Sequence, residues 1–78
     1  MATKDELEVL KIQAEIDKRI ADDRNLSKLD VTATVTNGRV ILVGTVPTNE
    51  LKSRIEKLAR AVKGVKEVDN QIAAVSGP

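Results

Sequence analysis

The sixteen residues from Val31 to Val46 constrain the fold of this chain most, because they form the pattern of a β-hairpin with a single favourable register. Apolar residues and threonines alternate on both sides of Asn37-Gly38, the pair that best tolerates the positive φ angles of a two-residue type I′ turn. With the turn at this point, Thr36 faces Arg39 and every cross-strand pair is fixed. The predicted pairs are Val35 with Val40, Ala33 with Leu42 and Val31 with Gly44 on one face, and Thr34 with Ile41 and Thr32 with Val43 on the other. A shift of one residue would bury the threonines, so turn chemistry and burial favour the same register.

Length and composition limit the size of the core and the compartments in which the protein is expected. Seventy-eight residues make one domain, expected to be ordered from about residue 5 to residue 75, and its core lacks Phe, Tyr and Trp. No apolar run approaches the ~20 residues of a membrane span. The first ten residues lack the basic start and apolar stretch of a signal peptide. We therefore expect a cytoplasmic protein, or a periplasmic one whose signal peptide has been removed, and the residues do not separate these two locations.

Two amphipathic helices are predicted to flank the hairpin. The first runs from about Asp5 to Asp23, with apolar residues at spacings of three and four. The second follows Pro47, has Thr48 as a favourable N-cap, and is expected to end with Gly64 as its C′ residue. The apolar stripe of the first helix consists of Val9, Ile12, Ile16 and Ile20, widened by Leu7, Leu10 and Ala14, and that of the second of Leu51, Ile55, Leu58, Ala59 and Val62.

A third strand, from about Glu67 to Val75, completes an α+β fold of order αββαβ. The second strand is expected in the middle of a three-stranded mixed sheet, because Ile41 and Val43 also make its outward face apolar. It would be antiparallel to the first strand and parallel to the third, with a right-handed crossover. Both helices then cover the same face, which gives a two-layer sandwich. Gly44 lies on the covered face, where its missing side chain is expected to let a helix approach closely.

These residues resemble the BON domain family over nearly the whole chain. The family pattern is an alternating strand, an Asn-Gly-type turn, V-x-L-x-G-x-V, a helix, and G-V-x-x-V-x-N. The matching residues are Asn37-Gly38, Val40, Leu42, Gly44 and Val46, followed by Gly64, Val65, Val68 and Asn70. The resemblance implies an αββαβ fold and a non-enzymatic module of bacterial envelope and stress proteins, to which phospholipid binding is often attributed. It also implies a unit that usually occurs in tandem or beside other modules.

The residue types themselves argue against catalysis, a metal site and nucleic-acid binding. The chain has no His or Cys to activate a serine or bind a transition metal, and no cofactor is expected. The acids Asp22, Asp23 and Asp30 lack the spacing of a calcium loop. Nucleic-acid binding is disfavoured because the GxxG loop of KH modules and all aromatic stacking platforms are missing.

Charge is the informative polar feature of the sequence. Lys4–Asp23 holds four bases and seven acids, a net of −3, whereas Glu50–Lys66 holds six bases and two acids, a net of +4. One interpretation is attraction between the two helices, and a second is that Lys52, Arg60 and Lys63 bind an anionic phospholipid surface weakly. The alternative function is a structural module that associates with itself or a neighbouring domain through an apolar spot at Ile41 and Val43.

Overall fold

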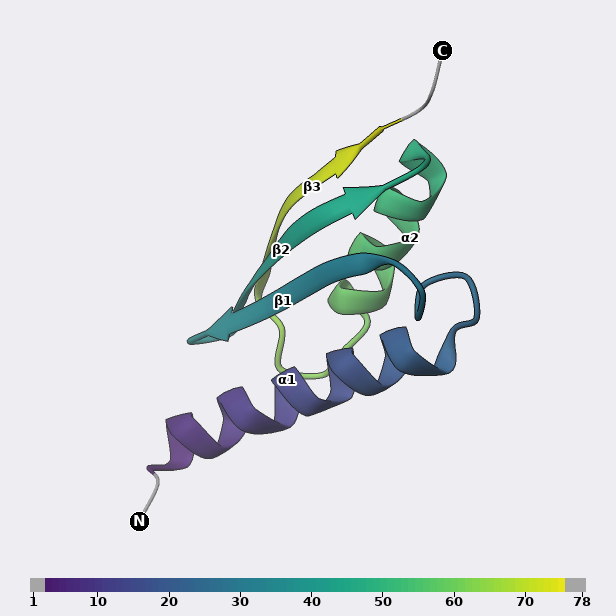
Figure 1. The fold of residues 1–78 in the computed structure, drawn as a ribbon. Coiled ribbons are helices and arrows are strands. Elements are labelled where there is room, and N and C mark those ends of the chain that lie inside the picture. Colours follow the sequence, from purple (N-terminus) through teal and green to yellow (C-terminus); the bar gives the residue numbers. More distant parts are fainter. Residues whose placement is uncertain (1–2, 76–78) are drawn as a thin grey trace.

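The structure, a computed structural model, describes residues 3–75 and contains five elements. These are α1 (Lys4–Asp22), β1 (Asp30–Thr36), β2 (Arg39–Val46), α2 (Asn49–Arg60) and β3 (Glu67–Ala74). The strand order is β1-β2-β3, with β2 antiparallel to β1 and parallel to β3 (Figure 1). The predicted α+β fold with its αββαβ order and central second strand is confirmed.

The hairpin has the predicted turn and the predicted register. Asn37 has a φ angle of 49° and Gly38 one of 82°, as a type I′ turn requires. Thr36 pairs with Arg39, and the ladder continues from there to Asp30 and Thr45 without a bulge. The threonines of β1 are exposed on the outer face, whereas Ala33 and Val35 are buried.

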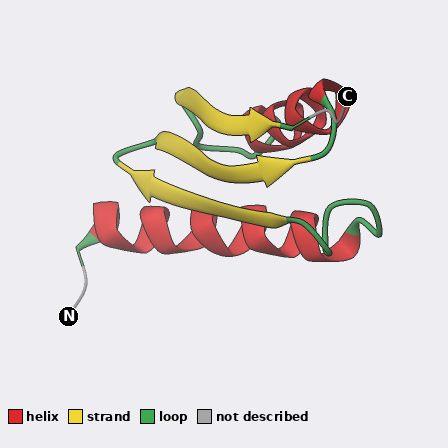
Figure 2. Ribbon diagram, turned by 45° about the horizontal axis from the view of Figure 1, so that its top comes forward, coloured by secondary structure: helices red, strands yellow, loops and turns green. Residues whose placement is uncertain are grey.

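The two helices cover one face of the sheet and lie beneath different strands. α1 runs alongside β1, and α2 packs against β2 and β3 (Figure 2). Between them lies a core made only of aliphatic side chains, and no polar or charged side chain is buried among the described residues. The core residues are Ile12, Ile16, Leu26, Ala33, Val35, Val40, Leu42, Val46, Ile55, Ala59, Val62, Val68 and Ile72.

The prediction that additional residues widen the buried apolar stripe of α1 is wrong. Leu7 is 48% exposed and Leu10 61% exposed, and Ala14 is also exposed. The reason is that α1 packs mainly on the edge strand β1, so only the narrow stripe through Ile12 and Ile16 reaches the core.

The helices begin as predicted, but α2 ends earlier than predicted. The side-chain oxygen of Thr48 accepts a hydrogen bond from the backbone nitrogen of Leu51, as an N-cap does. α2 ends at Arg60 with Ala61 as its C-cap, so Gly64 is not its C′ residue. Tighter turns replace the helical pattern after Arg60, because the nitrogen of Val62 donates to Ala59 and that of Val65 to Val62. This path buries Val62 and directs the chain toward the start of β3.

Position 44 needs glycine because a neighbouring strand, and not a helix, lies close to it. A Cβ atom at this position would overlap the carbonyl oxygen of Asp30 and lie 2.8 Å from the Cα atom of Val31. Its φ angle of 150° is also one that residues with side chains rarely adopt. The expected close approach therefore exists, but the partner is the backbone of β1.

Side-chain amides occupy backbone groups on both outer strands of the sheet. The Nε2 atom of Gln13 on α1 donates to the carbonyl oxygen of Ala33 on β1, at 2.7 Å. On β3, the Oδ1 atom of Asn70 accepts from the nitrogen of Ile72, and its Nδ2 atom donates to the carbonyl oxygen of Lys52 on α2, both at 3.1 Å. Asn70 thus interrupts the apolar stripe of β3 because it ties that strand to α2.

We expect Gly44→Ala to lower the free energy of unfolding by about 2 kcal/mol or more, because the new methyl group forces β1 and β2 apart and keeps an unfavourable φ angle. Chemical denaturation followed by circular dichroism measures this loss. Thr45→Ala, an exposed change on the same strand, is the control and should cost clearly less. Equal stabilities of the two variants would contradict the close contact at Gly44.

Candidate functional site

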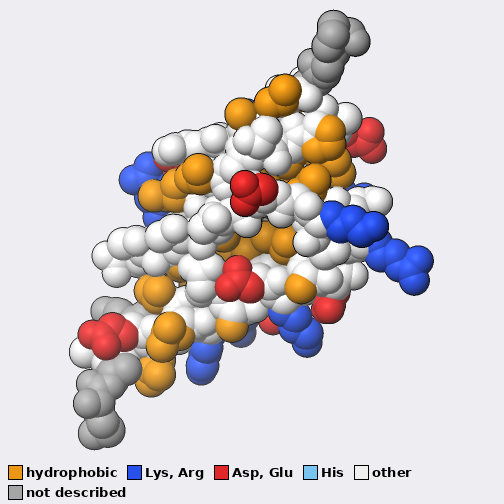
Figure 3. Space-filling model, viewed as in Figure 1, with side chains coloured by type: hydrophobic (Ala, Val, Ile, Leu, Met, Phe, Trp, Pro, Cys, Tyr) orange, Lys and Arg blue, Asp and Glu red, His pale blue; other side chains and the backbone are white. Residues whose placement is uncertain are grey.

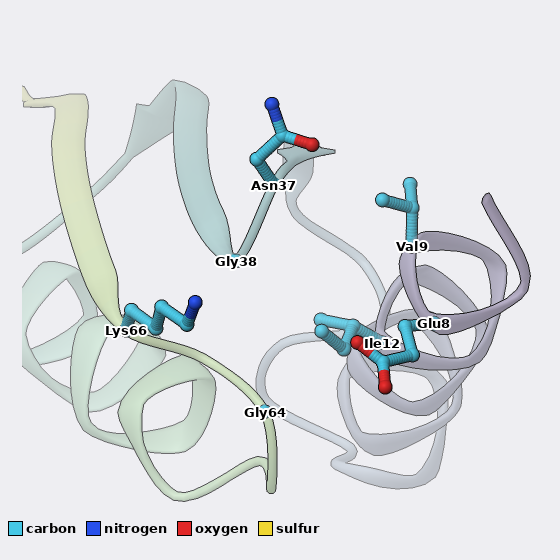
Figure 4. Close-up of a pocket in the computed structure, with 7 residues that line it drawn as sticks. All are labelled: Glu8, Val9, Ile12, Asn37, Gly38, Gly64 and Lys66. Carbon is cyan, nitrogen blue, oxygen red and sulfur yellow. The ribbon is translucent and has the colours of Figure 1, made fainter. Parts of the chain in front are cut away.

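A groove lies where the hairpin turn, the loop after α2 and the first turns of α1 meet. It has a volume of about 350 Å³ and is lined by residues from all three segments (Figure 4). The lining residues are Glu8, Val9, Ile12, Asn37, Gly38, Gly64 and Lys66. An adjoining apolar hollow extends it along α1 toward Leu10 and Val35.

The hairpin turn holds the groove together through one carbonyl group. The carbonyl oxygen of Gly38 accepts from the backbone nitrogens of Lys66 at 2.8 Å and Glu67 at 3.3 Å. The turn that joins β1 to β2 therefore also fixes the beginning of β3. Gly64, with a φ angle of 99°, lies against Ile12, and a Cβ atom there would be 3.1 Å from the Cδ1 atom of that side chain. The loop after α2 can therefore approach α1 closely.

The groove is lined by apolar and small residues and by one charged side chain of each sign. Glu8 on α1 and Lys66 before β3 lie on opposite sides of it (Figure 4). The other lining residues are Val9, Ile12, Asn37 and two glycines. Within residues 3–75, no cluster of three or more acidic side chains is arranged to hold a metal ion.

The sequence pattern that defines the BON domain matches residues 9–76, which is most of the chain. The chain belongs to the BON domain family. BON domains are typically non-catalytic. The predicted family resemblance is thus confirmed.

One curated relative is a lipoprotein of the outer membrane. The chain is 45% identical over 42 residues to the outer membrane lipoprotein DolP of Haemophilus influenzae. The match covers 54% of this chain and 22% of the relative, so the 42 matched residues span about a fifth of that lipoprotein.

The pattern residues of this BON domain have structural roles. Asn37 and Gly38 form the turn, Gly44 admits the backbone of β1, and Gly64 admits Ile12 of α1. Asn70 joins β3 to α2. The family pattern in this chain therefore defines the fold and the groove, and it contains no charged residue that would identify a ligand.

The three basic residues predicted to bind lipid are spread over α2 and the loop that follows it. Lys52 lies in the first half of α2 and is half-buried, and its carbonyl oxygen accepts from Asn70. Arg60, about 12 Å further along the helix axis, is exposed and has its Nε atom 3.4 Å from Glu56. Lys63 is exposed but follows the end of the helix, so it does not continue the same flank.

Lys63 lies near α1 instead. It lines two shallow hollows together with Lys11 and Ile12, and acidic residues of α1 contribute to both hollows. The structure therefore brings Lys63 together with Lys11, whereas the sequence grouped it with Lys52 and Arg60.

Attraction between the oppositely charged helical segments is visible at one point. The Nη2 atom of Arg54 on α2 lies 2.9 Å from the Oδ2 atom of Asp23, directly after α1. The Asp23 side chain is only 17% exposed and also accepts from the nitrogen of Asn25 through Oδ1. This pair uses one basic residue of α2 and leaves Lys52, Lys57 and Lys63 outside the ion pairs found among the described side chains.

The outer face of the sheet is mostly polar. Val43 is 49% exposed and Ile41 is half-buried, and the cross-strand partners of this pair are threonines on β1 and polar residues on β3. Figure 3 shows hydrophobic side chains in separate groups among polar ones over the strands. Others lie over the first half of α1, the region of the exposed Leu7 and Leu10. Ile41 and Val43 thus form a small apolar spot with a polar border.

The groove itself was not apparent from the sequence. The positive-φ turn at Asn37-Gly38 could be predicted from the sequence. Its contact with Lys66 could not, because the two residues are separated by 28 positions in the chain. Gly64 gave no separate signal, because the sequence explained it as the C′ residue of the second helix, and its close contact with Ile12 appears only in the structure.

We expect Gly38→Val to lower the free energy of unfolding by more than about 1 kcal/mol, because Gly38 needs a positive φ angle and a side chain there would press on Lys66. Gly38→Asn is the matched control, since asparagine tolerates this conformation better than valine. Thermal unfolding of the two variants tests this order. A Gly38→Val protein as stable as the parent would contradict the role of the turn conformation.

Proposed function

We propose that this BON domain is a non-catalytic module that associates weakly with anionic phospholipid surfaces of the bacterial envelope through Lys52, Arg60 and Lys63. The observation that carries the proposal is the separation of charge between the helical segments. The segment Lys4–Asp23 has a net charge of −3 and Glu50–Lys66 one of +4. α1 lies beneath β1 and α2 beneath β2 and β3 (Figure 1), so most of α2 lies apart from α1, whereas Lys63 in the following loop lies near Lys11.

The similarity to an outer membrane lipoprotein supports a membrane setting. Within residues 3–75 no helix has the length and hydropathy needed to cross a bilayer, so those helices would contact a membrane at its surface. The chain also lacks the Trp and Tyr residues that anchor proteins at the interface. Attraction between basic side chains and anionic headgroups is then the main source of binding energy.

The expected affinity is low. A basic residue close to an anionic surface contributes about 1 kcal/mol, so three residues supply at most about 3 kcal/mol, which corresponds to millimolar or weaker binding. The ion pair of Arg60 with Glu56 and the partial burial of Lys52 reduce this further. The acidic residues of α1 would be repelled by the same surface, so α2 and the following loop would face the membrane.

A first test is co-sedimentation with phosphatidylcholine vesicles that contain phosphatidylglycerol. We expect weak binding that falls steeply with added salt, because the screening length shortens from ~8 Å at physiological ionic strength to ~3 Å at 1 M. Lys52→Gln/Arg60→Gln/Lys63→Gln should lose the binding. Lys18→Gln/Arg24→Gln/Lys28→Gln, which removes the same charge near α1, should retain it. Binding that is indifferent to salt would contradict the proposal.

A second test locates the contact on the molecule. Amide shifts on addition of anionic bicelles should map to residues 52–63 and leave residues 5–23 unchanged. The competing surface is the exposed apolar pair Leu7 and Leu10 on α1. Shifts confined to α1, together with loss of binding in Leu7→Ser/Leu10→Ser, would contradict electrostatic contact through α2. They would indicate apolar contact through α1 instead.

The second candidate function is self-association or docking on a neighbouring domain through the outer sheet face. The observation that favours it is the exposure of Val43 beside Ile41 on the central strand. The spot is much smaller than the surface that stable interfaces bury, so this association would also be weak.

Ile41→Lys/Val43→Thr should abolish any concentration-dependent association of this domain. Light scattering over a wide concentration range measures it, with Thr32→Ser, on the same face, as the control. A parent protein that stays monomeric at the highest concentration would exclude association between copies through this face.

A further inference from the structure

The tip of the hairpin combines an exposed asparagine with a glycine as the next residue. The chain has four asparagines, and only Asn37 precedes glycine. Asn25, Asn49 and Asn70 are followed by leucine, glutamate and glutamine, whose side chains hinder the approach of the next backbone nitrogen. Glycine offers no such hindrance.

The side-chain amide of Asn37 and the N–H group of Gly38 make no hydrogen bond found within residues 3–75. The Asn37 side chain is exposed and takes part in none of the side-chain hydrogen bonds found within residues 3–75. Asn70, in contrast, uses both atoms of its amide. Among the described backbone hydrogen bonds, the carbonyl of Gly38 is an acceptor, whereas its N–H group is not a donor.

Gly38 is buried, and one of the two groups nearest to it, the Lys66 side chain, is movable. The nearest atoms to its missing side chain are the Cγ and Cδ methylenes of Lys66 and the carbonyl oxygen of Gly64. Lys66 is itself exposed, so rotation of its flexible side chain admits water to the turn.

We propose that Asn37 is a site of spontaneous deamidation in the folded protein, with Gly38 as the internal nucleophile. A water molecule or hydroxide removes the proton from the Gly38 nitrogen, which attacks the Cγ atom of Asn37. A bond forms between these two atoms, the bond from Cγ to Nδ2 breaks, and ammonia leaves with a proton from water. Water then opens the succinimide ring at either carbonyl and yields aspartate or isoaspartate. Water is the only co-reactant, and no atom is oxidised or reduced.

The isoaspartate product does not fit this turn. Its backbone contains one additional carbon atom, so the two-residue connection between Thr36 and Arg39 is lengthened. The carbonyl of Gly38 then moves away from the nitrogens of Lys66 and Glu67, which it holds in the intact turn. Either product adds one negative charge at the rim of the groove and changes the formal net charge from +1 to 0.

The experiment is incubation of the folded protein at mildly alkaline pH and 37 °C, followed by peptide mapping with mass spectrometry. We expect loss of the amide at Asn37 before any loss at Asn25, Asn49 or Asn70, and a mixture of aspartate and isoaspartate in the peptide that contains Asn37. The rate should rise with pH, and the intact protein should shift by one negative charge in ion exchange. Asn37→Asp is the control, because it carries the added charge on a normal backbone and should lose no ammonia at the turn.

A parallel incubation in concentrated urea separates the folded state from the unfolded chain. An Asn37 amide that reacts in urea and persists in the folded protein would overturn the proposal, as would equal loss at all four asparagines. The isolated isoaspartate form should melt below Asn37→Asp, since only the former lengthens the backbone. Equal melting temperatures of these two forms would overturn the structural consequence assigned to the product.

Discussion

The two hydrogen bonds accepted by the carbonyl oxygen of Gly38 connect the parts of this fold that are distant in sequence. A hairpin alone is only marginally stable in water and needs a third strand or a helix to persist. Here the carbonyl oxygen of the turn accepts hydrogen bonds from the nitrogens of Lys66 and Glu67. These bonds hold the start of β3 in line beside β2. The helix that precedes Lys66 is then held against the covered face, and the groove forms beside the turn.

The local parts of the fold could be predicted from sequence, and the parts that depend on distant segments could not. Asn37-Gly38 and the alternation around it determine the hairpin register from neighbouring residues alone. Thr48 likewise determines the start of α2. The early end of α2 at Arg60 depends on burial of Val62 and on the position of β3, which the helical periodicity does not contain. Contacts between distant segments also explain why Gly44 lies against a strand and not a helix, and why Leu7 and Leu10 are exposed.

The candidate binding residues show the same division. The sign and segregation of charge could be predicted by counting residues in each helical segment. The grouping of Lys52, Arg60 and Lys63 rested on a helix that continues to residue 63, whereas Lys63 lies beyond its end and beside Lys11. The membrane contact proposed for α2 would therefore depend on long side chains that reach a common plane from different positions, which favours a diffuse electrostatic attraction over recognition of one headgroup.

The amides of Gln13 and Asn70 have a consequence for how copies of this domain coexist. Each takes up a backbone group on an outer strand, where a strand from another molecule would otherwise pair. In Asn70, one atom of the side-chain amide bonds the strand and the other bonds α2. Moving this side chain away from the strand edge would therefore also break its contact with the helix. When such units are joined in one polypeptide, their sheets are discouraged from merging into a continuous ladder. The sheets of such units would then stay separate, although they share the same strand pattern.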